Sequence, residues 1–171
     1  MGVNQRSNMV MNEAEIARFI EGVRSATVAT NGPGGKPHLV AMWFALLDGE
    51  IFIETKAKSQ KVLNLRRDPA ISVLMEDGAT YDQLRGVAIE GTGEIIEDPE
   101  LLWKVGVSVY ERYTGPYSEA ARPTVEQMLN KRVAVRIRPT RTRSWDHAKL
   151  GLPSRGEPAG TTATAPDRRR R

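Results

Sequence analysis

The feature that most constrains the fold is a series of short apolar segments separated by turns rich in glycine and asparagine. The chain runs through Ala26–Thr30, the turn Asn31–Gly35, Pro37–Leu47, the turn Asp48-Gly49 and Glu50–Thr55. Gly and Asn tolerate the positive φ angles that tight turns between antiparallel strands require. We therefore predict three consecutive antiparallel strands arranged as a meander.

Three further strands are predicted downstream. They are Ala70–Met75, Arg85–Ile96 and Val133–Arg138, and the last alternates apolar and polar residues. The second contains glycines, which inside a strand often mark a bulge, a barrel corner or a close approach of another chain segment. Six strands with glycine-rich corners predict a mainly β fold, a closed or nearly closed antiparallel barrel with peripheral helices.

Helix signals flank these strands. Asn12 and Glu15 have the spacing of a capping box, which predicts a first helix with one apolar face. A second helix is expected from Lys58 to Arg67, a third after Asp98-Pro99, and a fourth from Thr124 to Asn130. In the third helix we expect Tyr110 and Tyr113 to pack in the core, because they lie near its apolar stripe.

Length and local composition predict one folded domain. The chain has 171 residues, and domains usually run to roughly 100 to 200 residues. We assign residues 12–150 to this domain and expect the segments 1–11 and 151–171 to be disordered. The second of these is rich in Pro, Gly, Ala and Thr and ends in four arginines.

The net positive charge comes from the C-terminal end. The chain has 25 Lys and Arg against 21 Asp and Glu, but residues 148–171 hold six of the basic and two of the acidic residues, which leaves 19 of each elsewhere. This balance does not favour a nucleic-acid partner. No apolar run approaches the ~18 residues of a membrane span, and the N-terminus lacks a secretory pattern. We expect a cytoplasmic protein with no membrane partner.

The residue types exclude several kinds of catalysis. The chain has no cysteine, so disulfides, thiolate nucleophiles and sulfur-based zinc sites are excluded. No triad spacing of Ser, His and Asp is recognisable, and we predict no metal site and assign no catalytic residue. His38 could donate a proton or simply form a hydrogen bond at the barrel rim. Tyr81 and Tyr117, both in loops, are alternative donors.

The segment Thr55 to Asn64 is a candidate phosphate site. A strand ends at a hydroxyl residue, and a helix then begins among Lys58, Ser59 and Lys61. Unpaired backbone N–H groups at a helix start favour a bound anion. The alternative is that Ser59 only caps the helix while Lys56, Lys58 and Lys61 form a solvated face.

The segment Lys36 to Ala45 has two apolar faces. One side of the segment carries Leu39, Ala41 and Trp43, and the other side carries His38, Val40 and Met42. A barrel core would cover one face. A planar ligand or the second subunit of a homodimer would cover the other.

The order of these features resembles the pyridoxamine 5'-phosphate oxidase-like split-barrel superfamily. The resemblance rests on Pro37-His38-x-Val40-x-Met42-Trp43-Phe44, the Asp48-Gly49 hairpin, Thr55, and Lys61-x-x-Asn64-Leu65-x-x-Asp68-Pro69. The run from Asn64 to Pro69 and the sequence Ser144-Trp145-Asp146 look most like the branch that uses the deazaflavin F420. The resemblance covers about residues 12–150.

The resemblance implies a six-stranded, FMN-binding split-barrel-like fold and a homodimer with cofactor sites between its subunits. It places the cofactor phosphate at Thr55, Lys56, Ser59, Lys61 and Asn64, and the cofactor ring at His38, Val40, Met42 and Trp43. Lys58 is added to the phosphate site because it lies three residues before Lys61 and can share a helix face with it. Relatives that use FMN carry an Arg-Lys pair where this chain has Gln60-Lys61. The missing cation favours F420 over FMN.

The expected activity is hydride transfer between reduced F420 and an electron-poor small molecule such as an enone, a quinone-like compound or a tetrapyrrole. The chemistry would belong to the cofactor, so no triad is needed. Two alternatives stay open. One is an oxidoreductase that binds FMN on the same fold, and the other is a non-catalytic carrier of flavin, deazaflavin or haem.

Overall fold

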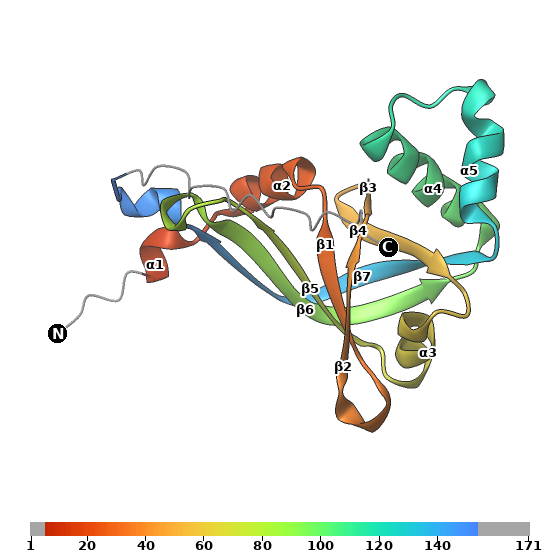
Figure 1. Cartoon of the computed structure of the whole chain (residues 1–171), viewed down its shortest axis with the longest axis horizontal. Helices are drawn as coiled ribbons and strands as arrows, with labels where there is room; N and C mark the ends of the chain where they lie inside the picture. Colours follow the sequence, from red (N-terminus) through yellow and green to blue (C-terminus); the bar gives the residue numbers. More distant parts are fainter. Residues whose placement is uncertain (1–5, 154–171) are drawn as a thin grey trace, which may run out of the picture.

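The structure is a computed structural model that describes residues 6–153, and in this range seven strands form one antiparallel sheet surrounded by helices (Figure 1). The strands are β1 (Ala26–Asn31), β2 (Pro37–Met42), β3 (Ala45–Leu47), β4 (Glu50–Lys56), β5 (Ala70–Asp77), β6 (Arg85–Ile96) and β7 (Arg132–Asp146). The α-helices are α1 (Arg6–Met9), α2 (Glu13–Gly22), α3 (Gln60–Arg67), α4 (Pro99–Tyr113) and α5 (Arg122–Leu129). Short 3-10 helices are η1 (Pro33–Gly35), η2 (Tyr81–Gln83), η3 (Glu119–Ala121) and η4 (His147–Leu150).

The sheet curls so that its two edges meet. Its strand order is β2-β1-β5-β6-β7-β4-β3, which puts β2 at one edge and β3 at the other. Only Trp43 and Phe44 separate these two strands in the sequence. The edges are therefore joined by the chain itself, without a hydrogen-bonded ladder between them, and the sheet is a barrel split along this line. We call the Trp43–Phe44 connection the seam.

The seam corrects two predictions made from the sequence. The segment Pro37–Leu47 is two strands rather than one, so the barrel has seven strands and not six. The predicted meander is interrupted at the same point: its two antiparallel pairings, β1 with β2 and β3 with β4, are both present, but they lie at opposite edges of the sheet. The strand breaks where the chain has to pass from one edge of the sheet to the other.

Two apolar clusters hold the sheet. Inside the barrel, buried residues from β1, β4, β5, β6 and β7 pack together, and Phe19 of α2 closes this core from outside the sheet. The second cluster lies on the opposite face of β4 and β7, where Val105 and Val109 of α4 cover Phe52. β4 therefore lies between two cores, which fixes the position of the residues that follow it.

Local signals in the sequence are confirmed at the turns and caps. Asn12 and Glu15 form the capping box at the start of α2. Asp48 and Gly49 have φ angles of 52° and 79°, as a tight hairpin turn requires. Gly86 leaves room for the indole of Trp145, because a Cβ atom there would lie 2.3 Å from its ring. A bulge interrupts the β6–β7 ladder between Glu90 and Gly91.

The described residues extend beyond the predicted domain by a few positions at each end. Residues 6–9 form α1, and the buried Met11 follows it, with its backbone N–H donating to Ser144 Oγ at 3.0 Å. The last strand continues beyond Arg138 to Asp146, because β6 supplies a partner along this whole length. The predicted tail lies outside the described residues from 154 onwards. Within residues 6–153 no helix is long and apolar enough to cross a membrane.

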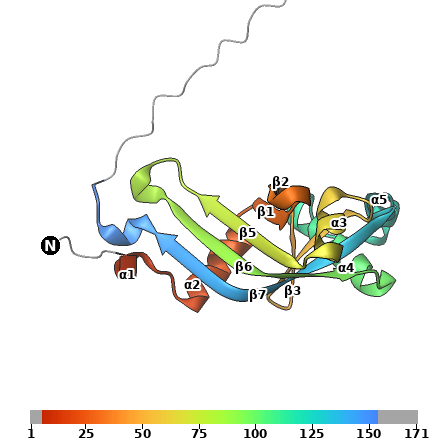
Figure 2. The same ribbon diagram turned by 90° about the horizontal axis from the view of Figure 1, so that it is seen from below.

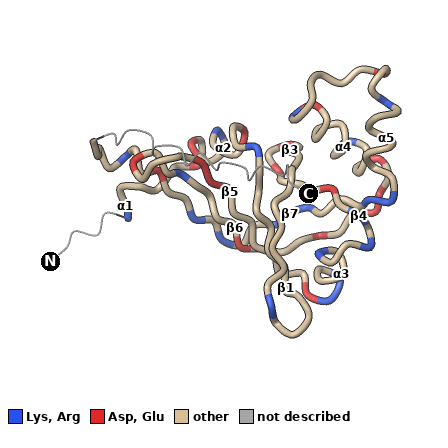
Figure 3. The backbone as a smooth tube through the Cα atoms, in the orientation of Figure 1, with Lys and Arg blue, Asp and Glu red and all other residues tan. Residues whose placement is uncertain are grey.

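The long strands β6 and β7 separate two ends of the molecule. The helices α1 and η4 lie at one end, and α3, α4 and α5 lie at the other (Figures 1 and 2). Lys and Arg residues lie along the backbone where β4 ends, α3 begins and β7 begins (Figure 3). The predicted phosphate segment lies in this second region.

Candidate functional site

Three side chains meet where β4 ends and α3 begins. Lys61 Nζ donates a hydrogen bond to Thr55 Oγ1 at 3.0 Å, and the hydroxyl oxygens of Thr55 and Ser59 are 3.2 Å apart. Ser59 is the N-cap residue of α3, but its side chain makes no capping hydrogen bond. The first backbone N–H groups of an α-helix have no partner within the helix. The site thus combines two hydroxyls, a cation and a helix start. We call Thr55, Ser59 and Lys61 the cradle.

Lys61 is a buried cation without a counter-ion. Its side chain is 8% exposed, and its hydrogen bond goes to a neutral hydroxyl. No carboxylate pairs with it among residues 6–153. Burial and, secondly, the positive charge of Arg132 lower the pKa of Lys61. Arg132 itself pairs with Glu54 at 3.1 Å, so that carboxylate is already used. An anion in the cradle would stabilise the charged form of Lys61.

The other predicted lysines lie outside the cradle. Lys56 is exposed and donates from Nζ to the backbone oxygen of Asn130 at 2.8 Å, which ties β4 to the turn before β7. Lys58 is exposed at the surface. Both add positive charge beside the cradle, but neither is buried in it.

Asn64 supports the cradle from behind. It is fully buried, and both ends of its side-chain amide are used within the chain. Its Oδ1 accepts from Gln60 Nε2 at 2.8 Å, and its Nδ2 donates to Thr30 Oγ1 at 3.0 Å. These bonds fix α3 against β1. The geometry makes Asn64 a residue that positions α3 rather than one that contacts a ligand.

The predicted ring-contacting residues of β2 divide between two faces. Val40 and Met42 point inward and pack against the barrel core. Trp43 is 59% exposed, and Leu39, which also points outward, is 64% exposed. The open apolar surface of this strand therefore belongs to Leu39, Ala41 and Trp43.

His38 connects β2 with the cradle end of the barrel. It lies directly opposite Thr30 in the β1–β2 ladder, and Thr30 is the residue bonded to Asn64. The Nδ1 atom of His38 is buried and has no hydrogen-bond partner in the described part of the chain. This end of the barrel therefore holds a buried polar ring atom whose hydrogen-bonding capacity is unused within the described residues.

Two contacts of this region could not be inferred from the sequence. The Thr30 hydroxyl accepts a hydrogen bond from the side-chain amide of Asn64, which lies 34 residues away in the sequence. Tyr113 packs against the second apolar cluster as expected, but the sequence did not indicate that its ring also stacks on Trp43, with ring centroids 4.5 Å apart and planes 6° apart. An aromatic residue in the last turn of a helix, just before Gly115-Pro116, is the one local signal that could have drawn attention to Tyr113.

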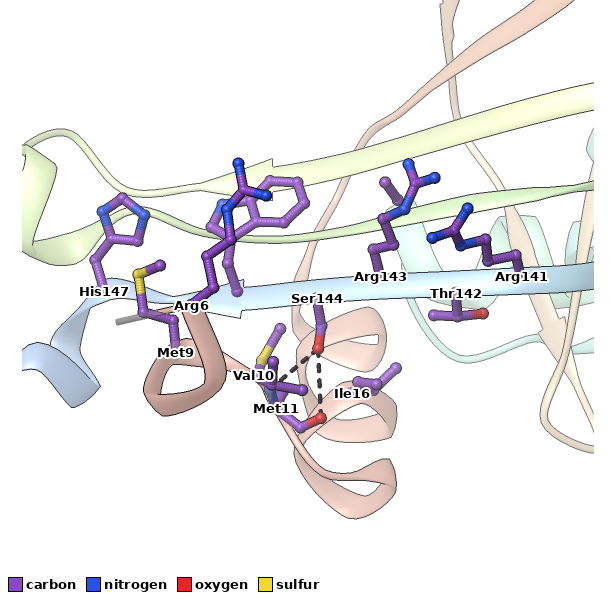
Figure 4. Close-up of a pocket in the computed structure, with 12 residues that line it drawn as sticks. Arg6, Met9, Val10, Met11, Ile16, Arg141, Thr142, Arg143, Ser144 and His147 are labelled. Carbon is purple, nitrogen blue, oxygen red and sulfur yellow. Dashed lines mark hydrogen bonds between the residues drawn. The ribbon is translucent and has the colours of Figure 1, made fainter. Parts of the chain in front are cut away.

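A groove with a volume of about 970 Å³ lies at the other end of the molecule. It runs along β7 beside α1 and the start of α2, and none of the predicted site residues lines it (Figure 4). Arg141 and Arg143 point to one side of β7, while Ser144 points to the other and holds Met11 (Figure 4). No group of three or more metal-ligating side chains lies close together within residues 6–153.

Comparison with solved structures identifies close and distant relatives. The conserved hypothetical protein Rv2991 from Mycobacterium tuberculosis is 62% identical, with a TM-score of 0.88 over 94% of this chain and 100% of that one. An F420 reductase is 27% identical, with a TM-score of 0.56 over 73% of this chain and 93% of that one. A putative 5-nitroimidazole antibiotic resistance protein from Bacteroides thetaiotaomicron shares the fold at 17% identity, with a TM-score of 0.66 over 80% and 84% of the two chains.

The family follows from a match over most of the domain. No curated protein matches the chain in sequence. The family model of pyridoxamine 5'-phosphate oxidase matches residues 13–146, a range that starts with α2 and ends with β7. The chain therefore belongs to the pyridoxamine 5'-phosphate oxidase family of split-barrel proteins.

Proposed function

We propose that the protein is an oxidoreductase that uses the deazaflavin F420 to reduce an electron-poor small organic molecule. The cradle would hold the phosphate group of the cofactor, and the outward side of β2 would face its ring. An F420 reductase among the structural relatives supports this choice.

The observation that carries the proposal is the burial of Lys61 without a carboxylate partner. A buried charge is costly unless it is paired. A phosphate group would supply the missing negative charge and would accept hydrogen bonds from Thr55, Ser59 and the first N–H groups of α3. The donors present in the cradle therefore fit a phosphate, and none of them is an acid that would repel one.

Gln60 favours F420 over FMN. Its side chain is neutral and forms a hydrogen bond with Asn64, so it adds no positive charge beside the cradle. Lys61 is the only buried cation among the described residues of the cradle. The phosphodiester of F420 carries one negative charge, whereas the terminal phosphate of FMN carries nearly two at neutral pH. A single buried cation matches the phosphodiester better. FMN on the same site remains the second candidate.

The residues of this chain would bind and orient the cofactor. When bound, F420 supplies the hydride that the reaction transfers. Lys61 and the two hydroxyls would anchor one end of it, and Asn64 would keep α3 in place. His38, at the end of β2 beside Thr30, is the side chain best placed to hold a proton near the bound cofactor.

We also propose that the active form is a homodimer. The outward face of β2 continues across the sheet, because Leu39 lies opposite Ala29, and Ala41 lies opposite Thr27, which in turn pairs with Leu74. These side chains are small or apolar. An exposed face of this kind, at an edge strand, suits contact with a second copy of the chain.

Titration of the purified protein with F420 and with FMN tests the proposed function. We expect saturable binding of F420, followed by turnover of reduced F420 with at least one member of an enone, quinone and tetrapyrrole panel. Preference for FMN would support the second candidate. Binding without turnover would indicate a carrier, and binding of neither cofactor below roughly millimolar concentration would contradict all of these functions.

The first prediction concerns Lys61→Ala. Removing this cation should weaken F420 binding by about 1.5 to 3 kcal/mol, because a charge-assisted contact to phosphate is lost. Lys58→Ala is the matched control, since it removes an exposed lysine from the same segment and should have a much smaller effect. The measurement is the dissociation constant by fluorescence titration. Equal affinities for Lys61→Ala and the wild type would place the phosphate elsewhere.

A further inference from the structure

The seam presents a tryptophan to solvent. At Phe44 the chain turns into the barrel core, where this residue is completely buried. Trp43, one residue earlier, points away from the core and keeps 59% of its surface exposed. A large exposed indole at a fixed place in a fold is uncommon unless it contacts something.

Tyr113 fixes this indole from one side. Its ring lies parallel to that of Trp43, with centroids 4.5 Å apart and an interplanar angle of 6°. Its hydroxyl accepts the backbone N–H of Phe44 at 3.1 Å. This N–H belongs to the short break between β2 and β3, so the tyrosine satisfies a backbone group that the sheet leaves unpaired. One face of the indole is thus covered, and the opposite face is open.

Arg112 anchors the same arrangement to the rest of the fold. Its guanidinium lies 4.4 Å from the centroid of the Phe44 ring and 5.8 Å from that of Tyr113. It also donates to the backbone oxygens of Ile20 and Val23 at the end of α2. The end of α4, the seam and the end of α2 are therefore held together, which leaves Trp43 little freedom to turn.

The open indole lies within reach of the cradle along β2. His38 stands at the cradle end of this strand and Trp43 just beyond its other end, five residues later, a separation of roughly 17 Å. β2 is an edge strand, so its free side is not covered by another strand of the sheet. A molecule anchored at the cradle and extended along β2 would bring its far end to Trp43.

We propose that Tyr113 is a positioning residue that holds Trp43 as a stacking platform for the flat ring of the cofactor. This inference rests on the proposed function. Tyr113 does not touch the cofactor; it keeps the indole in the orientation that the ring meets. Holding the platform in place before binding reduces the entropy lost on binding.

Substitutions at Tyr113 separate positioning from stability. Tyr113→Phe keeps the aromatic ring but loses the bond to Phe44, so it should lower the melting temperature by roughly 5 °C and leave the affinity for F420 within about twofold. Tyr113→Leu loses the stack as well, and should weaken binding about three- to tenfold, the range expected for one aromatic pair. Tyr110→Leu is the matched control on the same helix, because the Tyr110 side chain makes no ring contact or hydrogen bond within the described residues.

A double-mutant cycle with Trp43→Leu gives the decisive test. If Tyr113 acts through Trp43, Tyr113→Leu should weaken F420 binding in the wild type but not in the Trp43→Leu variant. A merely structural role would weaken binding equally in both backgrounds and would overturn the inference, as would an unchanged affinity in Tyr113→Leu alone. Failure of the wild type to bind either F420 or FMN would instead overturn the proposed function and this inference together.

Discussion

Lys61 is the residue on which cofactor binding should depend most, because its ammonium group has lost most of its water without gaining a carboxylate. The structure gives it one hydroxyl partner, Thr55, and a like charge, Arg132, whose effect adds to that of burial. Both effects oppose the charged form. In the free protein the charged form of Lys61 is therefore destabilised, and an anionic ligand would stabilise it.

This arrangement predicts that F420 affinity falls as the pH rises. Because the pKa of Lys61 is lowered in the free protein, the residue loses its proton below the usual lysine pKa. A bound phosphate favours the protonated form, so binding takes up a proton once the free residue is neutral. As the pH rises from neutral toward the usual lysine pKa, wild-type affinity should decrease through this lowered pKa.

Titration of the dissociation constant against pH measures this effect, with Lys61→Gln as the comparison. The glutamine variant should bind more weakly at neutral pH and should lose the part of the pH dependence that Lys61 causes. The Lys58→Ala variant should retain it. Identical pH profiles for the wild type and Lys61→Gln would show that Lys61 does not change its protonation on binding.

The sequence could identify the residue types at this site but not their separate roles. Thr55, Ser59 and Lys61 were predicted together, because they are close in sequence at the junction of a strand and a helix. Asn64 was expected to contact the phosphate. Its complete burial depends on Thr30, which lies on another strand, and such a contact cannot be read from local spacing.

Among the elements, α3 depends on a polar contact for its position. Asn64 is buried between this helix and β1, and its amide joins Gln60 to Thr30. The helix therefore carries both the cradle and the bond that orients it. A loss of this bond should affect stability and binding together.

We predict that Asn64→Ala lowers the free energy of unfolding by about 1 to 3 kcal/mol, because the buried Thr30 hydroxyl loses its partner. F420 affinity should also fall, since α3 is no longer fixed against β1. Denaturant unfolding and F420 titration measure the two effects. Gln60→Ala, which removes an exposed partner of the same amide, should cost much less. Wild-type stability in Asn64→Ala would contradict the role assigned to this amide.

Element boundaries were predictable where local chemistry determines them. The capping box at Asn12 and the Asp48-Gly49 hairpin follow from nearby residues, and both are confirmed. The break at the seam was not predictable, because no Gly, Pro, Asn or Asp lies between His38 and Leu47. The break exists because the two halves of this run pair with strands on opposite sides of the barrel.

For the whole molecule, the main prediction concerns the proposed homodimer. Leu39 is 64% exposed on the outward face of β2, and Leu39→Glu places a charge in the proposed contact. We expect the wild type to be a dimer and this variant to dissociate at micromolar concentration, because a buried unpaired charge is costly. Light scattering after size-exclusion chromatography gives the mass of each.

Leu63→Glu is the matched control, since Leu63 is 47% exposed on α3, away from this face. It should remain a dimer. A monomeric wild type would contradict the homodimer, and equal dissociation of both variants would place the contact elsewhere.

The seam also has a consequence for the order in which the chain folds. The β1–β2 and β3–β4 hairpins each form between neighbouring residues, but β4 reaches its second partner only when residues 52–56 pair with residues 132–136. Closing a loop of this length is entropically expensive, and non-local pairings slow folding. We expect two hairpins to form early on either side of Trp43 and Phe44. The barrel would close in the slow step, when β7 pairs with β4.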